Sequence, residues 1–238
     1  MRFESYIPAA AAKRRGEKLR GGFTLTEVLI AIIVMGIGLT MAAALFPAAM
    51  KETETSINDV NGTIIAANGM DIAAGVLAAD STDFPAPDTW YVFADADNTS
   101  IIPAGLQQYS GEPNRGFVIL GRQLAAGRNE YQLVSIAYWK NAGGDVTAEE
   151  LSGFAVDPND TTGLTVTHVG GGLRVGSPVI APNGKFAVIL SVNDDGTEGY
   201  LDRRLDSSDN TAWVVHEAGM NTKSPAIATL VRTVMLKQ

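Results

Sequence analysis

The sequence predicts an α+β protein in which a long N-terminal helix packs on a C-terminal globular head of antiparallel β-strands. Three observations lead to this fold class. Residues 28–50 form a run of 23 residues without a charged side chain, residues 51–79 continue with apolar side chains at helical spacing, and residues 80–238 alternate short apolar runs with turn dipeptides. The chain therefore divides into a short N-terminal segment (1–22), a helix (23–79) and a β-rich head (80–238).

Charge is distributed unevenly along the chain. Residues 1–22 carry six basic and two acidic side chains, a net charge of +4, whereas the remaining residues carry 12 basic and 24 acidic side chains, a net charge of −12. Because an acidic surface offers no counterion release to a polyanion, we expect no nucleic-acid partner. The sequence has no cysteine, which excludes a disulfide framework, a thiolate metal site and a cysteine nucleophile.

The uncharged run is long enough to cross a membrane. As a helix it covers roughly 35 Å, against a hydrocarbon core of about 30 Å. By the positive-inside rule its basic flank predicts a cytoplasmic N-terminus, with everything after Lys51 outside. A signal peptide cleaved near Ala44 is the alternative, but such a peptide needs only about 7–15 apolar residues and no carboxylate such as Glu27 at the start of the run.

A specific motif precedes and enters this run. Residues 18–31 read KLRGGFTLTEVLIA, with basic residues first, then a Gly22–Phe23 pair, then Glu27 at the fifth position counted from Phe23. This pattern resembles the processing signal of type IV prepilins and type II secretion pseudopilins over roughly 30 of the 238 residues. The resemblance implies that residues 1–22 are a leader, that a prepilin peptidase cuts between Gly22 and Phe23 on the cytoplasmic side, and that the new amine of Phe23 is methylated.

Glu27 has two interpretations. A carboxylate in a membrane costs about 2.5–3.5 kcal/mol at the helix centre and less near the end, so a partner is expected. The family resemblance implies that Glu27 and the Phe23 amine of a neighbouring subunit neutralise each other during assembly. The residues alone allow a local role, because Thr24-Leu25-Thr26-Glu27 fits a capping box in which Glu27 accepts a hydrogen bond at its own helix N-terminus.

Gly36 and Pro47 interrupt the apolar helix. Pro47 lacks an N–H group and clashes with the carbonyl of Ala43, so we expect a kink or a loosened turn there. In the family that the motif resembles, a glycine and a proline at such positions bracket a helix segment that extends when subunits pack into a filament. The alternative is a membrane anchor that is simply bent.

The amphipathic half of the helix is interrupted by Gly62, Gly69 and Gly75, each of which weakens a helix by about 1 kcal/mol relative to alanine. Strands are predicted at 131–139, 164–169, 186–192 and 230–236, and Asn183-Gly184 and Asp195-Gly196 are hairpin turn signals. We expect an antiparallel sheet or a small barrel packed on the second half of the helix.

The head shows no catalytic motif. His168 and His216 lie far apart on predicted strands, where structural histidines are the usual case. Two acidic loops, 157–160 and 194–198, contain oxygen ligands, and calcium sites occur in some pseudopilins, but neither loop has EF-hand spacing and solvated turns are the default interpretation. We therefore assign no catalytic residue, no metal ligand and no cofactor.

These observations predict a non-enzymatic subunit of a type IV pilus or of a type II secretion pseudopilus, held in the inner membrane before assembly. Its expected partners are the prepilin peptidase and other pilin or pseudopilin subunits. The alternatives are an uncleaved single-pass protein with an extracytoplasmic binding domain, and a secreted enzyme released near Ala44. Without cysteine the chain lacks the disulfide of many type IV pilins, which favours a pseudopilin. Its length after cleavage, 216 residues, is as compatible with a minor subunit as with a major one.

Overall fold

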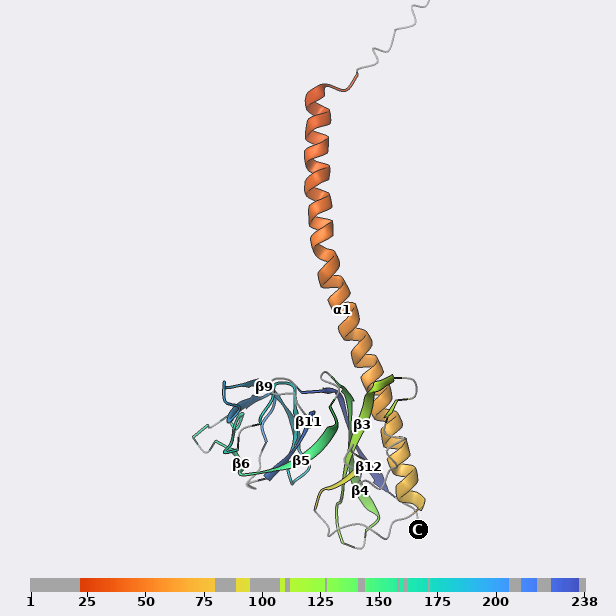
Figure 1. Cartoon of the computed structure of the whole chain (residues 1–238), viewed down its shortest axis with the longest axis vertical. Coiled ribbons are helices and arrows are strands. Elements are labelled where there is room, and N and C mark those ends of the chain that lie inside the picture. The colour runs from red at the N-terminus through yellow and green to blue at the C-terminus, as the bar shows by residue number, and fades with distance from the viewer. Residues whose placement is uncertain are drawn as a thin grey trace, which may run out of the picture. The chain divides into compact units, whose positions relative to one another are not determined.

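The computed structural model describes residues 22–79, 89–94, 108–109, 112–126, 128–140, 144–157, 159–160, 162–170, 172–205, 211–217 and 224–235 (Figure 1). The chain forms two compact units, Met1–Glu52 and Thr53–Gln238. A single helix, α1 (Leu25–Ala79), runs from the first unit into the second, and the described strands pair antiparallel. The predicted fold class, a long helix with an antiparallel β-rich head, is confirmed.

In the first unit, every described residue of α1 is exposed. The helix is long and apolar enough to cross a membrane by length and composition. It continues through Pro47, which leaves the Ala43 carbonyl without its usual helical donor. The hydroxyl of Thr40 donates to the carbonyls of Ile37 (2.9 Å) and Gly36 (3.1 Å), so this polar side chain is satisfied within its own helix.

In the second unit, the end of α1 packs on a five-stranded sheet in the order β1-β3-β4-β12, with β2 also paired to β3. Its strands are β1 (Tyr91–Ala94), β2 (Gln108–Tyr109), β3 (Glu112–Gln123), β4 (Glu130–Trp139) and β12 (Ala226–Met235). The strand expected at 131–139 is confirmed as β4, and the one expected at 230–236 as β12, apart from Leu236, which lies outside the described residues.

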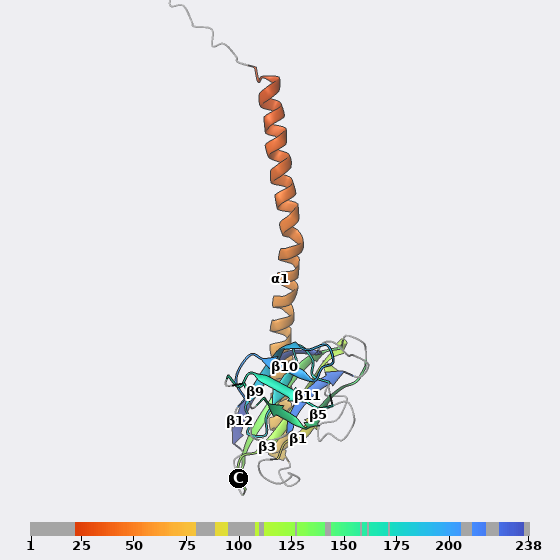
Figure 2. The same ribbon diagram turned by 90° about the vertical axis from the view of Figure 1, so that its left-hand side faces the viewer.

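A seven-stranded sheet is inserted between β4 and β12, in the order β5-β11-β8-β9-β10-β7-β6. Its strands are β5 (Val146–Ser152), β6 (Phe154–Val156), β7 (Thr165–His168), β8 (Pro178–Ile180), β9 (Phe186–Val192), β10 (Glu198–Leu201) and β11 (Thr211–Glu217). The first and last strands of this order, β5 and β6, are separated in the chain only by Gly153, so the sheet curls back on itself. We call it the curled sheet; in Figure 2 it lies in front of β3 and β12.

Three apolar layers hold the second unit together. The first lies between α1 and the five-stranded sheet and contains Met70, Leu77, Phe93, Phe117 and Leu133. The second lies between the two sheets and contains Val118, Leu120, Ile136, Ile180 and Val215. The third fills the curled sheet and contains Phe154, Val166, Ile189, Leu201 and Val214. Because β3 and β4 are covered on both faces, they are near-continuous apolar runs rather than alternating ones.

The two predicted hairpin turns are present. Asn183-Gly184 connects β8 to β9, and Asp195-Gly196 connects β9 to β10. Gly184 and Gly196 have φ angles of 84° and 72°, in the left-handed region that glycine occupies without steric cost. The strand expected at 164–169 is confirmed as β7.

A group of hydrogen bonds joins the two sheets at the β8–β9 turn. Arg122 of β3 and Gln132 of β4 reach across to this turn, and Trp90 lies just before β1 on the same side. We call this group the turn latch; it comprises Trp90, Arg122, Gln132 and the turn 181–184.

Of the three glycines in the second half of α1, Gly62 and Gly69 lie where the helix meets the five-stranded sheet. A Cβ atom at Gly69 would approach the Phe117 ring to 2.8 Å and the Ser135 hydroxyl to 2.9 Å, and one at Gly62 would approach Ala228 to 3.0 Å. Both glycines are therefore required for close packing. A Cβ at Gly75 has no neighbour within 4 Å among the described residues, and nothing in the structure explains that glycine.

Gly69→Ala is expected to lower the free energy of unfolding by about 1–2 kcal/mol, because overpacking against Phe117 outweighs the gain in helix propensity. Gly75→Ala is the matched control and should raise stability by up to about 1 kcal/mol. Chemical unfolding of the full chain in detergent, followed by tryptophan fluorescence, measures both. If the two variants shifted stability in the same direction, the close approach at Gly69 would be wrong.

Candidate functional site

The candidate processing site lies just before the helix. Residues 22–24 are neither helix nor strand, and α1 begins at Leu25. Phe23 is 87% exposed, and a Cβ at Gly22 would have no neighbour within 4 Å among the described residues. The Gly22–Phe23 peptide bond is thus in an open, non-helical segment, the form in which a protease binds a substrate backbone. Residues 1–21, which belong to the predicted leader, lie outside the described residues.

Thr24 and Glu27 form a capping box at the start of α1. The backbone N–H and the hydroxyl of Thr24 both donate to Glu27 Oε2, at 2.9 and 3.0 Å, and the Glu27 N–H donates to Thr24 Oγ1 at 3.2 Å. This reciprocal arrangement satisfies two backbone donors that the first helical turn leaves without partners. The local role proposed for Glu27 from the sequence is therefore confirmed.

The same geometry places the Glu27 carboxylate close to Phe23, whose amine would be charged if the chain were cut before it. Both hydrogen bonds from Thr24 reach Oε2, and no described residue donates to Oε1. A cut before Phe23 creates an α-amine, with an ordinary pKa of about 7.7–8.0, one residue before Thr24. The N–H groups of the first helical turn, the Glu27 carboxylate and, if the chain is cut, the Phe23 α-amine thus lie within a few residues of one another.

Downstream of this box the helix presents an unpartnered apolar surface. Phe23, Glu27, Val28, Ala31, Ile32 and Met35 line a shallow depression of about 320 Å³ along one side of α1. A Cβ at Gly36 would meet none of the described residues within 4 Å, so no described contact within the chain requires glycine there. Small residues on an apolar helix allow another helix to approach closely in lipid.

The acidic loops of the head use their oxygens internally. Asp160 Oδ1 accepts from the Thr162 amide (2.8 Å) and hydroxyl (2.5 Å), and Oδ2 accepts from the amides of Leu164 (3.1 Å) and Thr165 (2.8 Å). Asp195 Oδ1 accepts from the amide and hydroxyl of Thr197. In the part of the chain that the structure describes, no group of three His, Cys, Asp or Glu side chains is placed to hold a metal ion.

Asp160 should make stability depend on acid pH. The hydrogen bond from the Thr162 hydroxyl, followed by those from the Thr165 and Thr162 amides, holds the pKa of Asp160 well below its ordinary value of 3.8. A depressed folded-state pKa contributes stability that is present above the unfolded pKa and lost as pH falls through the folded one. We expect the melting temperature to fall between about pH 5 and pH 2, and Asp160→Asn to reduce that fall. Glu150→Gln, at an exposed strand position, is the control and should leave the pH profile unchanged.

The two histidines contact ordinary strand residues in the part of the chain that the structure describes. His168 is buried and its Nε2 lies 3.1 Å from the Ser152 carbonyl, where the chain passes from β5 to β6. His216 lies between Thr147 (3.4 Å) and Glu149 (3.6 Å) on the neighbouring strand. Both contacts support the structural role predicted for these histidines.

Sequence reasoning missed the turn latch. Its hydrogen-bonded pairs are up to 91 positions apart, as for Trp90 and Ala181, and no local pattern marks them as partners. Only the antiparallel register, which places Arg122 opposite Gln132, indicates that these two side chains share a site.

Comparison with known proteins supports the N-terminal motif. A family model described as the prokaryotic N-terminal methylation motif matches residues 18–43. No curated protein and no solved structure matches the chain. The matched segment contains the Gly22–Phe23 pair, the capping box and most of the apolar run. Residues 18–43 therefore carry the prepilin-type cleavage and methylation signal of type IV pilins and pseudopilins.

Proposed function

We propose that this protein is a non-enzymatic structural subunit of a type IV pilus or a type II secretion pseudopilus. It is cut between Gly22 and Phe23, methylated at Phe23 and assembled through α1. The observation that carries the proposal is the register of the matched motif: the Gly22–Phe23 pair, Glu27 at the fifth position and an exposed apolar helix follow in that order.

The exposed apolar helix supports a membrane location before assembly. Large side chains such as Ile33, Leu39 and Phe46 are 57%, 73% and 68% exposed, which is unfavourable in water and favourable in a bilayer. The basic leader predicts a cytoplasmic N-terminus. The head then lies on the extracytoplasmic side, and the subunit moves from the inner membrane into a filament.

In the proposed mechanism, Glu27 exchanges partners during assembly. In the unassembled subunit, the capping box gives the carboxylate hydrogen bonds from Thr24, which lowers the cost of keeping it at the membrane. In the filament, the amine of Phe23 from a neighbouring subunit neutralises it. Gly36 and Pro47 allow, respectively, close helix packing and a local change in helix length.

The mass of the natural N-terminus tests this proposal. A mature chain that starts at Phe23 with one added methyl group supports it. A chain that starts at Met1 indicates the uncleaved single-pass alternative, and one that starts near Leu45 indicates release by an ordinary signal peptidase. Either of the last two results would overturn the proposal.

Glu27→Gln separates the two roles of Glu27. Glutamine also completes a capping box but carries no charge, so it keeps the local role and removes the pairing with an amine. We expect Glu27→Gln and Glu27→Ala to be cleaved but to enter filaments about tenfold less, or lower, because one charge-assisted contact worth about 1.5–3 kcal/mol is lost per subunit.

The readout is the amount of each variant in sheared filaments relative to the amount in membranes. Glu54→Gln, an exposed acid further along α1, is the control and should assemble normally. Normal incorporation of Glu27→Gln together with poor incorporation of Glu27→Ala would show that only the capping role matters.

A further inference from the structure

The outer wall of the curled sheet consists of β7, the end of β9 and β10. The curled sheet contributes to the core between the two sheets through β5, β8 and β11, with residues such as Val146, Ile180 and Val215. The described residues of β7 and β10 contribute none to it. This wall therefore lies away from the core between the two sheets. It belongs to the part of the head inserted between β4 and β12, beyond the layer that packs on α1.

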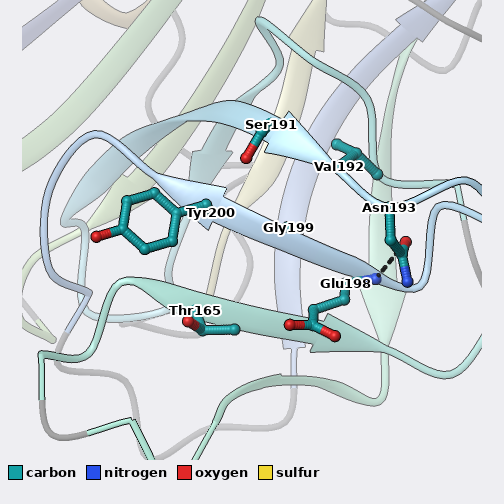
Figure 3. Close-up of a pocket in the computed structure, with 7 residues that line it drawn as sticks. All are labelled: Thr165, Ser191, Val192, Asn193, Glu198, Gly199 and Tyr200. Atoms are coloured by element: carbon teal, nitrogen blue, oxygen red, sulfur yellow. Dashed lines mark hydrogen bonds between the residues drawn. The ribbon is translucent and has the colours of Figure 1, made fainter.

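This wall contains a groove of about 330 Å³ (Figure 3). Ser191, Tyr200 and Thr165 are cross-strand partners and form one row across β9, β10 and β7. Glu198 lies two residues from Tyr200 on β10, and Asn193 borders the groove at the hairpin end. The lining residues are Thr165, Ser191, Val192, Asn193, Glu198, Gly199 and Tyr200.

The side chains of this row are not needed for the core. The inward positions of the same strands, occupied by Val166, Ile189 and Leu201, are fully or almost fully buried. Tyr200 instead exposes 43% of its surface. Among the residues that the structure describes, none hydrogen-bonds the hydroxyls of Ser191 and Tyr200 or the carboxylate of Glu198. The groove therefore combines an accessible aromatic ring with exposed hydroxyl and carboxylate groups that no described side chain occupies.

The charge around the groove restricts its ligand. Residues 146–217 contain eleven acidic and four basic side chains, a net charge of −7, and among the described residues no lysine or arginine lines the groove. Phosphate, sulfate and uronate groups would be repelled. A ring face attracts C–H groups that carry partial positive charge, and hydroxyl and carboxylate groups hydrogen-bond O–H groups. A neutral sugar presents both kinds of group.

We propose that the groove beside Tyr200 binds a neutral oligosaccharide. One sugar ring stacks on Tyr200, and its hydroxyl groups hydrogen-bond Ser191 and Glu198. A filament subunit that carries this inserted wall thereby contacts glycan in addition to assembling through α1. The binding requires neither cleavage at Gly22 nor assembly, so the two proposals succeed or fail separately.

Isothermal titration of the purified full chain in detergent tests the proposal. The probes are cellotetraose, maltotetraose, mannotetraose and chitotetraose, which distinguish plain hexose chains from N-acetylated ones, with oligogalacturonate as the anionic comparison. We expect binding of at least one neutral probe and none of oligogalacturonate. Tyr200→Ala should weaken that binding about tenfold or more, and Glu198→Ala by a smaller factor.

Val169→Ala is the matched control, because Val169 is an 89% exposed apolar residue in the turn directly after β7 and does not line the groove. It should bind as the unsubstituted chain does. Circular dichroism spectra that match between variants show that Tyr200→Ala is folded. The proposal is overturned by absence of binding to every neutral probe, by equal binding of oligogalacturonate, or by equal losses in the Tyr200 and Val169 variants.

Discussion

Gly22→Leu should leave residues 1–22 attached to nearly all copies of the protein. A peptidase that cuts after residue 22 must bring its catalytic groups close to an extended backbone, and a branched side chain at that position blocks the approach. We expect the cleaved fraction to fall by about tenfold or more, because a single misplaced group at a scissile bond costs that much in positioning. Mass spectrometry of the membrane-bound chain measures the cleaved fraction directly.

The structure indicates that this substitution should act on recognition of the chain by the peptidase and not on folding. A Cβ at residue 22 meets no atom of the described residues within 4 Å, so we expect the substitution to leave the packing of the described fold unchanged. Gly22→Ala, with one methyl group, should retain part of the cleavage, and Gly21→Leu should show whether bulk elsewhere in the leader matters. Normal processing of Gly22→Leu would contradict a cut at the Gly22–Phe23 bond and would also remove the source of the Phe23 amine that Glu27 requires.

The helix and the turns were predictable because their signals are local. The uncharged run between Val28 and Met50 and the Thr24–Glu27 spacing act over a few residues of one helix. The hairpins at Asn183-Gly184 and Asp195-Gly196 depend on a backbone conformation that glycine alone adopts freely. For the same reason the candidate processing segment could be located from the sequence before its geometry was known.

The arrangement of the strands was not predictable, because it depends on contacts between distant residues. The sequence allowed one sheet or a small barrel, whereas the head contains a five-stranded sheet and a separate curled sheet inserted between β4 and β12. Gly153 lets the chain pass from β5 to β6, but a single glycine between two strands does not reveal which other strands pair with them. Gly69 illustrates a second limit: by propensity alone it weakens the helix, and only the position of Phe117 shows that packing requires it.

Arg122→Ala should destabilise the head by about 2–3 kcal/mol, because it removes the centre of the turn latch. Arg122 Nη1 donates to the Pro182 carbonyl at 2.6 Å, Nη2 to the Asn183 carbonyl at 2.7 Å, and Nε to Gln132 Oε1 at 2.8 Å. Its guanidinium also lies 5.3 Å from the centre of the Trp90 ring. Three donors of one planar group are thus used at once.

The remaining carbonyls of the turn also accept hydrogen bonds from side chains in or next to the five-stranded sheet. Gln132 Nε2 donates to the Gly184 carbonyl at 3.1 Å, and Trp90 Nε1 donates to the Ala181 carbonyl at 3.1 Å. Each carbonyl of the turn 181–184 therefore accepts a hydrogen bond from the side chain of Trp90, Arg122 or Gln132, which lie in or next to the five-stranded sheet. This latch and the apolar layer between the sheets together hold the curled sheet in place. Apolar contacts do not depend strongly on direction, so the hydrogen bonds of the latch set the orientation.

Arg122→Lys distinguishes the latch from a simple charge effect. Lysine keeps the positive charge but has one ammonium group in place of a planar fork, so we expect it to recover less than half of the lost stability. Arg203→Ala is the control, because Arg203 pairs with its chain neighbour Asp202 at 2.9 Å on the surface and should cost less than about 1 kcal/mol. Chemical unfolding gives the free energies, and hydrogen exchange at the β8–β9 turn should accelerate in Arg122→Ala but not in Arg203→Ala. If Arg122→Lys were as stable as the unsubstituted chain, charge alone would account for the role of Arg122, and the fork geometry would not be what orients the curled sheet on β3 and β4.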